Sequence, residues 1–333
     1  MSEPARRIGS PQSVELPAEV LADLDRVEDR LRAELESREP RLEEIAMHLV
    51  GAGGKRIRPL VVLLAFHAAA GAGTDRRRND AVEVAVALEL IHSATLLHDD
   101  IIDTNRMRRG RPSAYERFGL ADTLVAGDYL FCRAFVLCGR FEGEVIRWAG
   151  EACVTLTEGE ILQARFRRNP SVTLDDYHEI IQRKTAVLFA TGARTAAHLA
   201  GVDGPTIDTM DACGQHLGLA FQMQDDLLDV DGAQAITGKP QGLDLRDGNP
   251  SMPMVLALPR DERLRELFAT DALDETAIAE GLRRIRASGV LDDVVTAVRR
   301  EADAGLACLT TLPPSGSRDA LIALVEGLDH RIS

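Results

Sequence analysis

The sequence lacks any cysteine pattern typical of disulfides or a metal site. It has five cysteines, an odd number, scattered over 333 residues without the spacing of metal ligands. We therefore expect them to be small buried side chains that stay reduced. A reducing compartment fits this use of cysteine, so the sequence predicts a cytoplasmic protein.

The chain also lacks an excess of positive charge and a long hydrophobic run. Its formal net charge is −14, which argues against nucleic-acid binding through a basic surface. No stretch suggests a transmembrane helix, and the N-terminus has no apolar signal-peptide core. With 45% hydrophobic residues, the chain can still bury a sizeable core.

Strand patterns, repeats of fixed period and long linkers are absent as well. From Pro17 onward, apolar residues recur at steps of three and four, which is typical of helices. The sequence therefore predicts a flexible tail over 1–16 and a single all-α bundle over 17–333, with a central cavity between facing helices. The longest expected helices cover residues 81–103, 121–141, 144–165, 174–200 and 207–231.

One long stretch, 232–253, is rich in glycine, proline and charge. It directly follows the last of these helices. We expect it to be irregular and to act as a mobile lid.

Two aspartate clusters stand out in this helical pattern, each inside an apolar segment. Asp99 and Asp103 belong to the first cluster, and Asp225 and Asp229 to the second. Residues four apart lie on one face of a helix, so each pair should point the same way. Carboxylates held so close repel each other unless a cation lies between them. Mg²⁺ is the natural candidate because it takes oxygen ligands and phosphate oxygens.

Basic and polar residues accompany the two clusters. Lys55 and Arg58 follow two glycines just before a helix, a setting that suits anion capture. The further candidates are Arg108, Arg109, Lys184, Lys239 and Arg246, together with the uncharged His92, Thr185 and Gln222. Carboxylates that hold metal, combined with separate cations that hold phosphate oxygens, predict a site for more than one diphosphate.

Each of these residues also has an ordinary explanation. Acidic pairs are usually solvated helix faces, and Arg56 or Arg106 alone would be expected on the surface. His92 on an apolar helix is usually a core residue, and Lys184 could lie along the side of a helix. The joint order of the motifs nevertheless favours a functional site.

The motifs together resemble those of the trans-prenyltransferases, the all-trans isoprenyl diphosphate synthases. The resemblance runs from about residue 20 to the C-terminus. It rests on Gly53 to Pro59, on His92 to Asp103 with Arg108-Arg109-Gly110, on Lys184-Thr185, on Gln222 with Asp225 to Asp229, and on Gly238-Lys239-Pro240 with Asp244-Leu245-Arg246. It implies an all-α fold of the isoprenoid synthase type, a homodimer, and head-to-tail condensation of isopentenyl diphosphate with an allylic diphosphate.

The resemblance also implies roles for individual residues. Asp99 and Asp103 would hold two Mg²⁺ ions, and Asp225, in one cluster with Asp229, would hold a third. The residues expected to bind isopentenyl diphosphate are Lys55, Arg58, His92 and Arg109. Those expected to bind the allylic diphosphate are Arg108, Lys184 and Lys239, with Thr185 and Gln222 offering oxygen dipoles near the allylic cation. Lys184, Thr185 and Gln222 are thus the expected catalytic residues.

One position departs from the family pattern. The family loop usually carries a lysine where this chain has Asn249. Either lid closure over the diphosphate is weaker here, or Arg246 takes over the charge, and the sequence leaves both open.

Small residues near the first cluster predict a long product. Short-chain relatives typically place a bulky aromatic four or five residues before the first aspartate, where this chain has Thr95 and Ala94. Ile91 is a partial obstacle one turn further along, and Phe131 or Phe135 could end the channel. We expect a product of roughly thirty to fifty carbons, which could draw the protein to a membrane surface. The alternatives are a farnesyl or geranylgeranyl diphosphate synthase, a class I terpene cyclase and a non-catalytic partner subunit.

Overall fold

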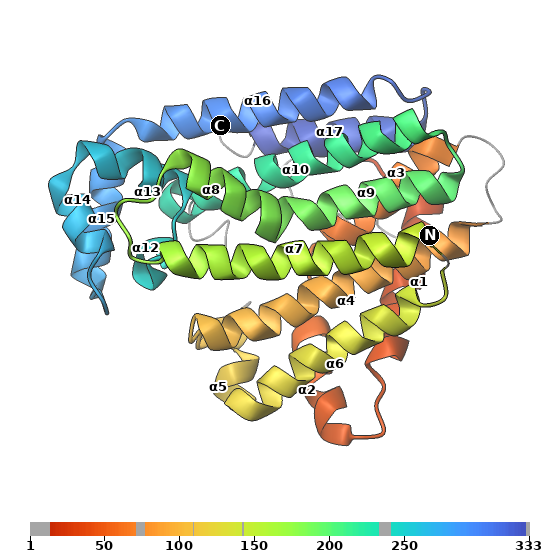
Figure 1. Cartoon of the computed structure of the whole chain (residues 1–333), viewed down its shortest axis with the longest axis horizontal. Helices are drawn as coiled ribbons and strands as arrows, with labels where there is room; N and C mark the ends of the chain where they lie inside the picture. Colours follow the sequence, from red (N-terminus) through yellow and green to blue (C-terminus); the bar gives the residue numbers. More distant parts are fainter. Residues whose placement is uncertain (1–13, 71–76, 109, 142, 233–240, 331–333) are drawn as a thin grey trace, which may run out of the picture.

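The computed structural model describes residues 14–70, 77–108, 110–141, 143–232 and 241–330; for 329 and 330 it describes the backbone only. Within these residues the chain is almost entirely helical, as expected. The long helices run side by side along the long axis of the molecule, from α16 at one edge to α6 near the other (Figure 1).

The helices alternate with short connections along the described chain. Their bounds are α1 Ala18–Leu35, α2 Pro40–Val50, α3 Ile57–Ala70, α4 Arg78–Ile102, α5 Ala114–Phe118, α6 Leu120–Cys138, α7 Glu144–Phe166, α8 Leu174–Ile181, α9 Val187–Ala200, α10 Gly204–Asp231, α12 Leu243–Asp247, α13 Met252–Ala257, α14 Glu262–Phe268, α15 Glu275–Ala287, α16 Val290–Leu309 and α17 Gly316–His330. A 3₁₀ turn, Leu258–Arg260, follows α13.

Helices α3 and α4 form the centre of the bundle. Most residues of α3 are buried, and α4 packs against α1, α3, α6 and α9. A helix that is apolar on most sides must be covered on most sides, which explains this central position. Val14 and Leu16, part of the expected tail, also pack against the core, whereas residues 1–13 lie outside the described part.

The expected bounds of the long helices are confirmed to within a few residues. The largest differences, three residues each, are at the starts of α4 and α10 and at the end of α6. Capping residues account for some of the observed starts. α10 begins at Gly204, where the Asp203 side chain accepts a hydrogen bond from Thr206 N and Pro205 suits the first turn. Thr173 and Asp176 form a reciprocal capping box at the start of α8.

The segment predicted as one helix over 174–200 is interrupted. α8 and α9 are joined by a single π-helical turn, Gln182–Ala186, which contains Lys184 and Thr185. Such turns insert one extra residue into a helix and occur often at functional sites. Apolar periodicity cannot reveal this turn, since the helix continues on both sides of it.

Two other expectations about secondary structure were wrong. A short antiparallel ladder pairs Met107–Arg108 (β1) with Arg111–Pro112 (β2). Strands of two residues are too short to show alternation in the sequence. The stretch 232–253 is not irregular throughout, because α12 and the start of α13 lie within it and Leu245 is buried in the core.

The expectation that no segment resembles a transmembrane helix also needs correction. Among the described residues, α4 is long and apolar enough to span a membrane by length and composition. However, 72% of its most apolar window is buried inside the protein. The composition of α4 therefore fits a core helix that other helices cover on most sides.

Candidate active site

The first aspartate cluster lies at the C-terminal end of α4. Asp99 is partly buried, and the Lys184 ammonium of the π turn lies 3.6 Å from its Oδ1. The same ammonium lies 2.5 Å from Glu160 Oε2 on α7. Burial raises the pKa of Asp99 to about 6, although Lys184 lowers it, and the charges of Glu160 and Asp103 add to the rise. Burial and two neighbouring carboxylates therefore oppose the ionisation of Asp99, and Lys184 favours it.

Lys184 is held as a cation between these two carboxylates. Burial alone would lower its pKa, but the charges of Asp99 and Glu160 outweigh burial and raise it. The structure thus brings Lys184 to the first cluster, and its expected contact with the allylic diphosphate stays a prediction. It also adds Glu160, which the sequence analysis did not select.

A second cation near the first cluster was also missed. Arg167, at the end of α7, donates to Asp103 Oδ1 through Nη2 and to Asn249 Oδ1 through Nε at 3.2 Å. Arg246 instead pairs with Glu275 on α15, at 2.7 Å. Asn249 therefore contacts a cation from α7, and Arg246 is directed to another partner. The motif comparison could not find Arg167, because it lies outside the motifs that carry the resemblance.

The central aspartate of the first cluster has a different role from its neighbours. Asp100 is completely buried, and its Oδ1 accepts a hydrogen bond from Arg108 Nε at 2.6 Å. Arg108 was expected to hold the allylic diphosphate. In this structure its side chain secures the turn after α4 to the buried carboxylate.

The second cluster lies on α10, and its aspartates also divide into two kinds. Asp225 is exposed, whereas Asp229 accepts hydrogen bonds from Leu243 N at 3.0 Å and Asp244 N at 3.2 Å. Asp229 thereby fixes the start of α12. The predicted metal ligands of this cluster are thus one solvent-facing carboxylate and one that already binds backbone.

A partly buried hydrogen-bond chain connects the second cluster to the π turn. Thr185 Oγ1 donates to Gln222 Oε1 at 2.8 Å, and Gln222 Nε2 donates to Asp226 Oδ1 at 2.8 Å. Asp226 also accepts from Tyr177 OH at 2.6 Å and from Met252 N at 3.0 Å. Burial raises the pKa of Asp226 to about 7 despite these hydrogen bonds, which lower it. The chain holds two of the three expected catalytic side chains, Thr185 and Gln222, in one orientation.

Contacts around α12 connect the two clusters: Arg167 joins Asp103 to Asn249 just after α12, and Asp229 binds the start of α12. Burial raises the pKa of Asp247 to about 6, and the charges of Asp103 from the first cluster and Asp229 from the second add to the rise. Burial and nearby carboxylates also raise the pKa of Asp244. Carboxylates of α4, α10 and α12 thus share one electrostatic environment. Asp244 and Asp247 were visible in the loop motif, but their charge was not used in the prediction.

Of the residues expected to bind isopentenyl diphosphate, Arg58 is the best defined. Its guanidinium lies 4.9 Å from the centre of the Phe189 ring. Burial lowers its pKa to about 10, against the charges of Glu89 and Asp225. Lys55 is exposed near the start of α3, and His92 is partly buried on α4. Arg109 and Lys239 lie outside the described residues.

The expectation that Arg56 lies on the surface was wrong. Its side chain is buried and binds Glu28 at 2.7 Å, Glu89 at 2.8 Å and the Val50 carbonyl at 2.9 Å. These contacts fasten the Gly53-Gly54 segment to α1 and α4. Arg106, by contrast, is exposed as expected.

The aspartates of the first cluster fit a magnesium site whose remaining ligands are water and the phosphate oxygens of a substrate. Within the described ranges, no three His, Cys, Asp or Glu side chains gather closely enough to hold a metal by themselves. Mg²⁺ is usually held by one or two carboxylates with waters and phosphate oxygens. Asp99 and Asp103 offer such a pair, and the raised pKa of Asp99 shows that a positive charge would be favourable beside it.

The residues expected to set the chain length lie on α4, on the N-terminal side of Asp99. Ala94 and Ile91 are completely buried, and Thr95 Oγ1 donates to the His92 carbonyl at 2.7 Å. Phe131 packs against the core, with its ring 5.8 Å from that of His98. Phe135 is 40% exposed, and its expected part in ending the channel stays a prediction, as does that of Phe131. The central cavity itself stays a prediction.

Comparison with known proteins decides the family. A family model described as Polyprenyl synthetase matches residues 39–285. The chain belongs to the polyprenyl synthetase family. It is 33% identical to the octaprenyl diphosphate synthase of Escherichia coli (strain K12) over 290 residues, which cover 86% of this chain and 88% of the relative. It is also 34% identical to the chloroplastic solanesyl diphosphate synthase 1 of Arabidopsis thaliana over 308 residues, 92% of this chain and 76% of the relative.

A solved structure of the same family matches almost the whole chain. The polyprenyl synthase of Caulobacter crescentus CB15, complexed with calcium and isoprenyl diphosphate, superposes with a TM-score of 0.88 at 33% identity. The match covers 98% of this chain and 99% of that structure. The all-α fold expected from the sequence is therefore confirmed.

Proposed function

We propose that this member of the polyprenyl synthetase family is an all-trans polyprenyl diphosphate synthase. It would condense isopentenyl diphosphate with an allylic diphosphate and form a product of roughly thirty to fifty carbons. The observation that carries the proposal is that contacts around α12 bring the two aspartate clusters together. Arg167 binds both Asp103 of the first cluster and Asn249 just after α12, and Asp229 of the second cluster binds the start of α12. Lys184 lies beside Asp99. The names of the octaprenyl and solanesyl relatives support a long product.

The reaction breaks the C1–O bond of the allylic diphosphate, and the bonding electrons leave with the diphosphate. The double bond of isopentenyl diphosphate attacks C1, and the departed diphosphate then accepts the proton that the new chain loses. Lys184, fixed by Asp99 and Glu160, places positive charge where the leaving group gains negative charge. The oxygen atoms of Thr185 and Gln222 lie on the hydrogen-bond chain that would face the allylic cation.

Mg²⁺ is part of the proposal. When bound, it would neutralise negative charge on the departing diphosphate. Asp99, Asp103 and Asp225 are the proposed ligands for up to three ions, and Asp229 would join them after releasing the start of α12. The calcium in the complex of the Caulobacter relative supports a divalent cation in this family.

The other diphosphate would be held without metal. Arg58, Lys55, His92 and Arg109 are the proposed contacts with isopentenyl diphosphate. The desolvated guanidinium of Arg58 is suited to this role, because a buried cation gains more from an anion than a solvated one does. Arg108 and Lys239 stay proposed contacts with the allylic diphosphate.

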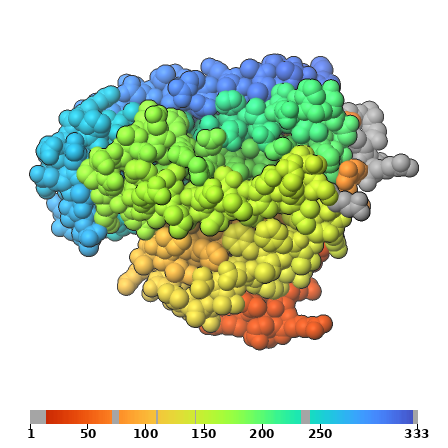
Figure 2. Space-filling view, viewed as in Figure 1, coloured from red at the N-terminus to blue at the C-terminus, as the bar shows by residue number. Residues whose placement is uncertain are grey.

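A homodimer with a cytoplasmic location completes the proposal. Apolar side chains are exposed along α6 and α7, which occupy much of the face shown in Figure 2. Val136, Val154 and Ile161 are each more than 60% exposed. An exposed patch of this kind marks an interaction surface, and a second copy of the chain is the proposed partner. The apolar product would provide contact with a membrane surface.

The decisive experiment is a product assay. Purified protein is incubated with isopentenyl diphosphate, Mg²⁺ and allylic primers of several lengths, and the products are sized. Asp99→Asn should lower turnover by roughly a thousandfold, because it removes the negative charge of one of the proposed magnesium ligands. The matched control Asp292→Asn, at an exposed position on α16, should keep wild-type turnover.

The outcomes of this assay separate the candidate functions. Full activity in excess EDTA, or no chain elongation with any primer, would contradict the proposal. Products that stop at fifteen or twenty carbons would identify the shorter-chain alternative, and hydrocarbons without diphosphate would identify a terpene cyclase.

A further inference from the structure

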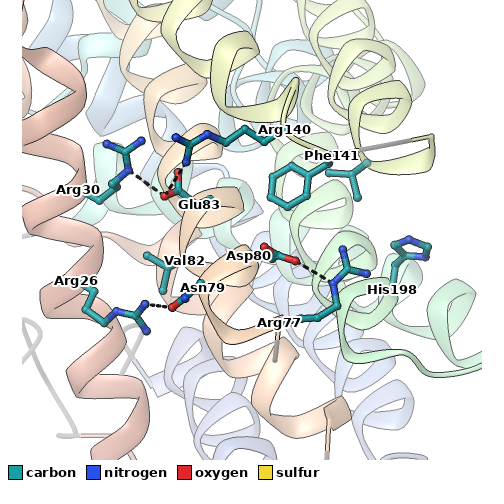
Figure 3. Close-up of a pocket in the computed structure, with 11 residues that line it drawn as sticks. Arg26, Arg30, Arg77, Asn79, Asp80, Val82, Glu83, Arg140, Phe141 and His198 are labelled. Atoms are coloured by element: carbon teal, nitrogen blue, oxygen red, sulfur yellow. Dashed lines mark hydrogen bonds and ion pairs between the residues drawn. The ribbon is translucent and has the colours of Figure 1, made fainter. Parts of the chain in front are cut away.

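A second region rich in arginine lies far from the aspartate clusters. It is a cavity of about 850 Å³ at the N-terminal end of α4. Its walls come from α1, α4, the connection between α6 and α7, and the end of α9, as the labelled residues in Figure 3 show. Glu83 on α4 precedes Asp99 by sixteen residues, which corresponds to about 24 Å along the helix axis. The cavity is therefore separate from the proposed active site.

Four arginines line this cavity (Figure 3): Arg26, Arg30 and Arg140 point toward α4, and Arg77 lies at the start of α4 itself. Arg30 Nε lies 2.9 Å from Glu83 Oε1, and Arg140 Nη1 lies 3.3 Å from the same oxygen. Arg77 Nε lies 2.9 Å from Asp80 Oδ2. Arg26 donates to Asn79. The guanidinium groups thus converge from three segments of the chain on one wall.

The charges in this cavity do not balance. Besides Asp80 and Glu83 on the wall, Asp23 pairs with Arg26 at 2.9 Å and Glu34 pairs with Arg30. Asp23 and Glu34 also pair with Arg78 and Arg133 behind the lining, so the network of described residues holds six arginines and four carboxylates, an excess of two positive charges. This excess is notable in a chain whose formal net charge is −14. Each guanidinium carries five N–H donors in a planar fork that matches phosphate oxygens. The contacts described use only one or two donors of each.

The donors are also accessible. The side chains of Arg77 and Arg140 are 45% and 57% exposed, so an anion can reach them from solvent. Phe141, Val145 and Val82 supply an apolar part of the wall beside the arginines. A purely structural set of ion pairs would need neither the empty volume nor this apolar wall.

We propose that this arginine-lined cavity binds the phosphate group of an amphiphilic phosphate ester. The guanidinium groups would hold the phosphate, and Phe141 and Val145 would contact the adjoining apolar chain. Such a group could belong to a soluble ester or to a lipid headgroup, and both share this chemistry. The inference does not depend on the reaction proposed for the aspartate clusters.

The test measures binding without substrates or Mg²⁺. In one arm octyl phosphate is titrated calorimetrically, and in the other the protein is sedimented with phosphatidylcholine vesicles with and without phosphatidylglycerol. The double variant Arg77→Ala/Arg140→Ala should weaken binding at least about tenfold in whichever of the two measurements shows binding by wild type. The matched control Arg263→Ala/Arg283→Ala removes the same charge from exposed positions on α14 and α15 and should bind like wild type.

A third variant excludes loss of fold as the explanation. Asp80→Asn removes the carboxylate that competes for Arg77, so binding should become severalfold tighter. Arginine-dependent binding of octyl phosphate alone would identify a soluble ester, and binding to phosphatidylglycerol vesicles alone a lipid headgroup. Equal binding by wild type and the double variant in both arms, or no binding by wild type, would overturn the proposal. Prenyl turnover should be unchanged in all three variants, because none alters the aspartate clusters or their cations.

Discussion

At the scale of single residues, the two aspartate clusters divide into buried and accessible members. Asp100 and Asp226 are buried and hydrogen-bonded to Arg108 and Tyr177, whereas Asp225 faces solvent. A buried carboxylate is stable only when partners replace the water that it loses. The central aspartates therefore position their helices. Of the outer ones, Asp229 binds the start of α12 and Asp103 binds Arg167, whereas Asp225 is exposed.

Arg167 is the residue whose role the structure changes most. It contacts both Asp103 and Asn249, the position where relatives usually carry lysine. Arg167→Gln should lower turnover about tenfold, because it removes a charge-assisted contact near the departing diphosphate. Adding Asn249→Lys to this variant should restore part of the loss. Steady-state kinetics with both substrates measure the effect.

The control for this prediction is Arg165→Gln, an exposed arginine two residues away on α7. It should keep wild-type kinetics. Unchanged turnover in Arg167→Gln, or no recovery after adding Asn249→Lys, would show that Arg167 does not supply the charge of the missing lysine.

Product length should depend on two small residues of α4. Ala94 and Ala87 are both buried, and they lie seven residues apart, about 10 Å along the helix. Ala94→Phe should shorten the products strongly by filling the expected channel near Asp99. Ala87→Phe should stop chains later, at an intermediate length. Chromatography measures the product lengths. Products of wild-type length from both variants, or shorter products from Ala87→Phe than from Ala94→Phe, would contradict the expected channel.

At the scale of secondary-structure elements, the π turn is the feature that places Lys184 and Thr185. It lies against α7 at Gly159, where an added Cβ would be 2.8 Å from Arg183 Cβ and 2.8 Å from Lys184 N. No side chain fits between these two elements without a shift. The close approach brings Glu160, the next residue on α7, to the ammonium of Lys184.

Gly159→Ala should therefore displace the π turn. We expect a loss of about 1–3 kcal/mol in the free energy of unfolding, and a fall in turnover larger than the loss of stability would explain. Chemical denaturation and kinetics measure the two effects. Gly150→Ala in the same helix meets no atom within 4 Å and should be neutral or slightly stabilising. Equal behaviour of the two variants would contradict this account of the π turn.

At the scale of the whole molecule, α4 connects two charged regions of opposite character. Its C-terminal end carries the first aspartate cluster, and its N-terminal end borders the arginine-lined cavity. Between them it is covered by other helices on most sides. The apolar core of α4 is therefore the scaffold that keeps the two regions apart.

The exposed apolar residues of α6 and α7 predict the oligomeric state. Val154→Asp/Ile161→Asp should convert the proposed dimer to monomers, because desolvating two carboxylates at the interface is costly. Light scattering at low micromolar concentration measures the mass. Met47→Asp, at an exposed apolar position on α2, should leave the dimer intact. A monomeric wild-type protein, or a dimer that persists in the double variant, would rule out this interface.

The sequence by itself determined the all-α fold and the main candidate residues. Apolar periodicity follows from 3.6 residues per turn, so the long helices could be located to within a few residues. The aspartate clusters could be recognised because carboxylates inside apolar segments are costly without a partner.

Only the tertiary structure decided which carboxylates are buried, where the helix contains a π turn, and which cations lie beside the site. Arg167 and Glu160 come from α7, and they meet Asp103 and Lys184 through packing between elements far apart in the chain. Arg56 likewise proved to be buried because Glu28 and Glu89 converge on it. Such contacts depend on the relative placement of several helices, which local periodicity does not encode.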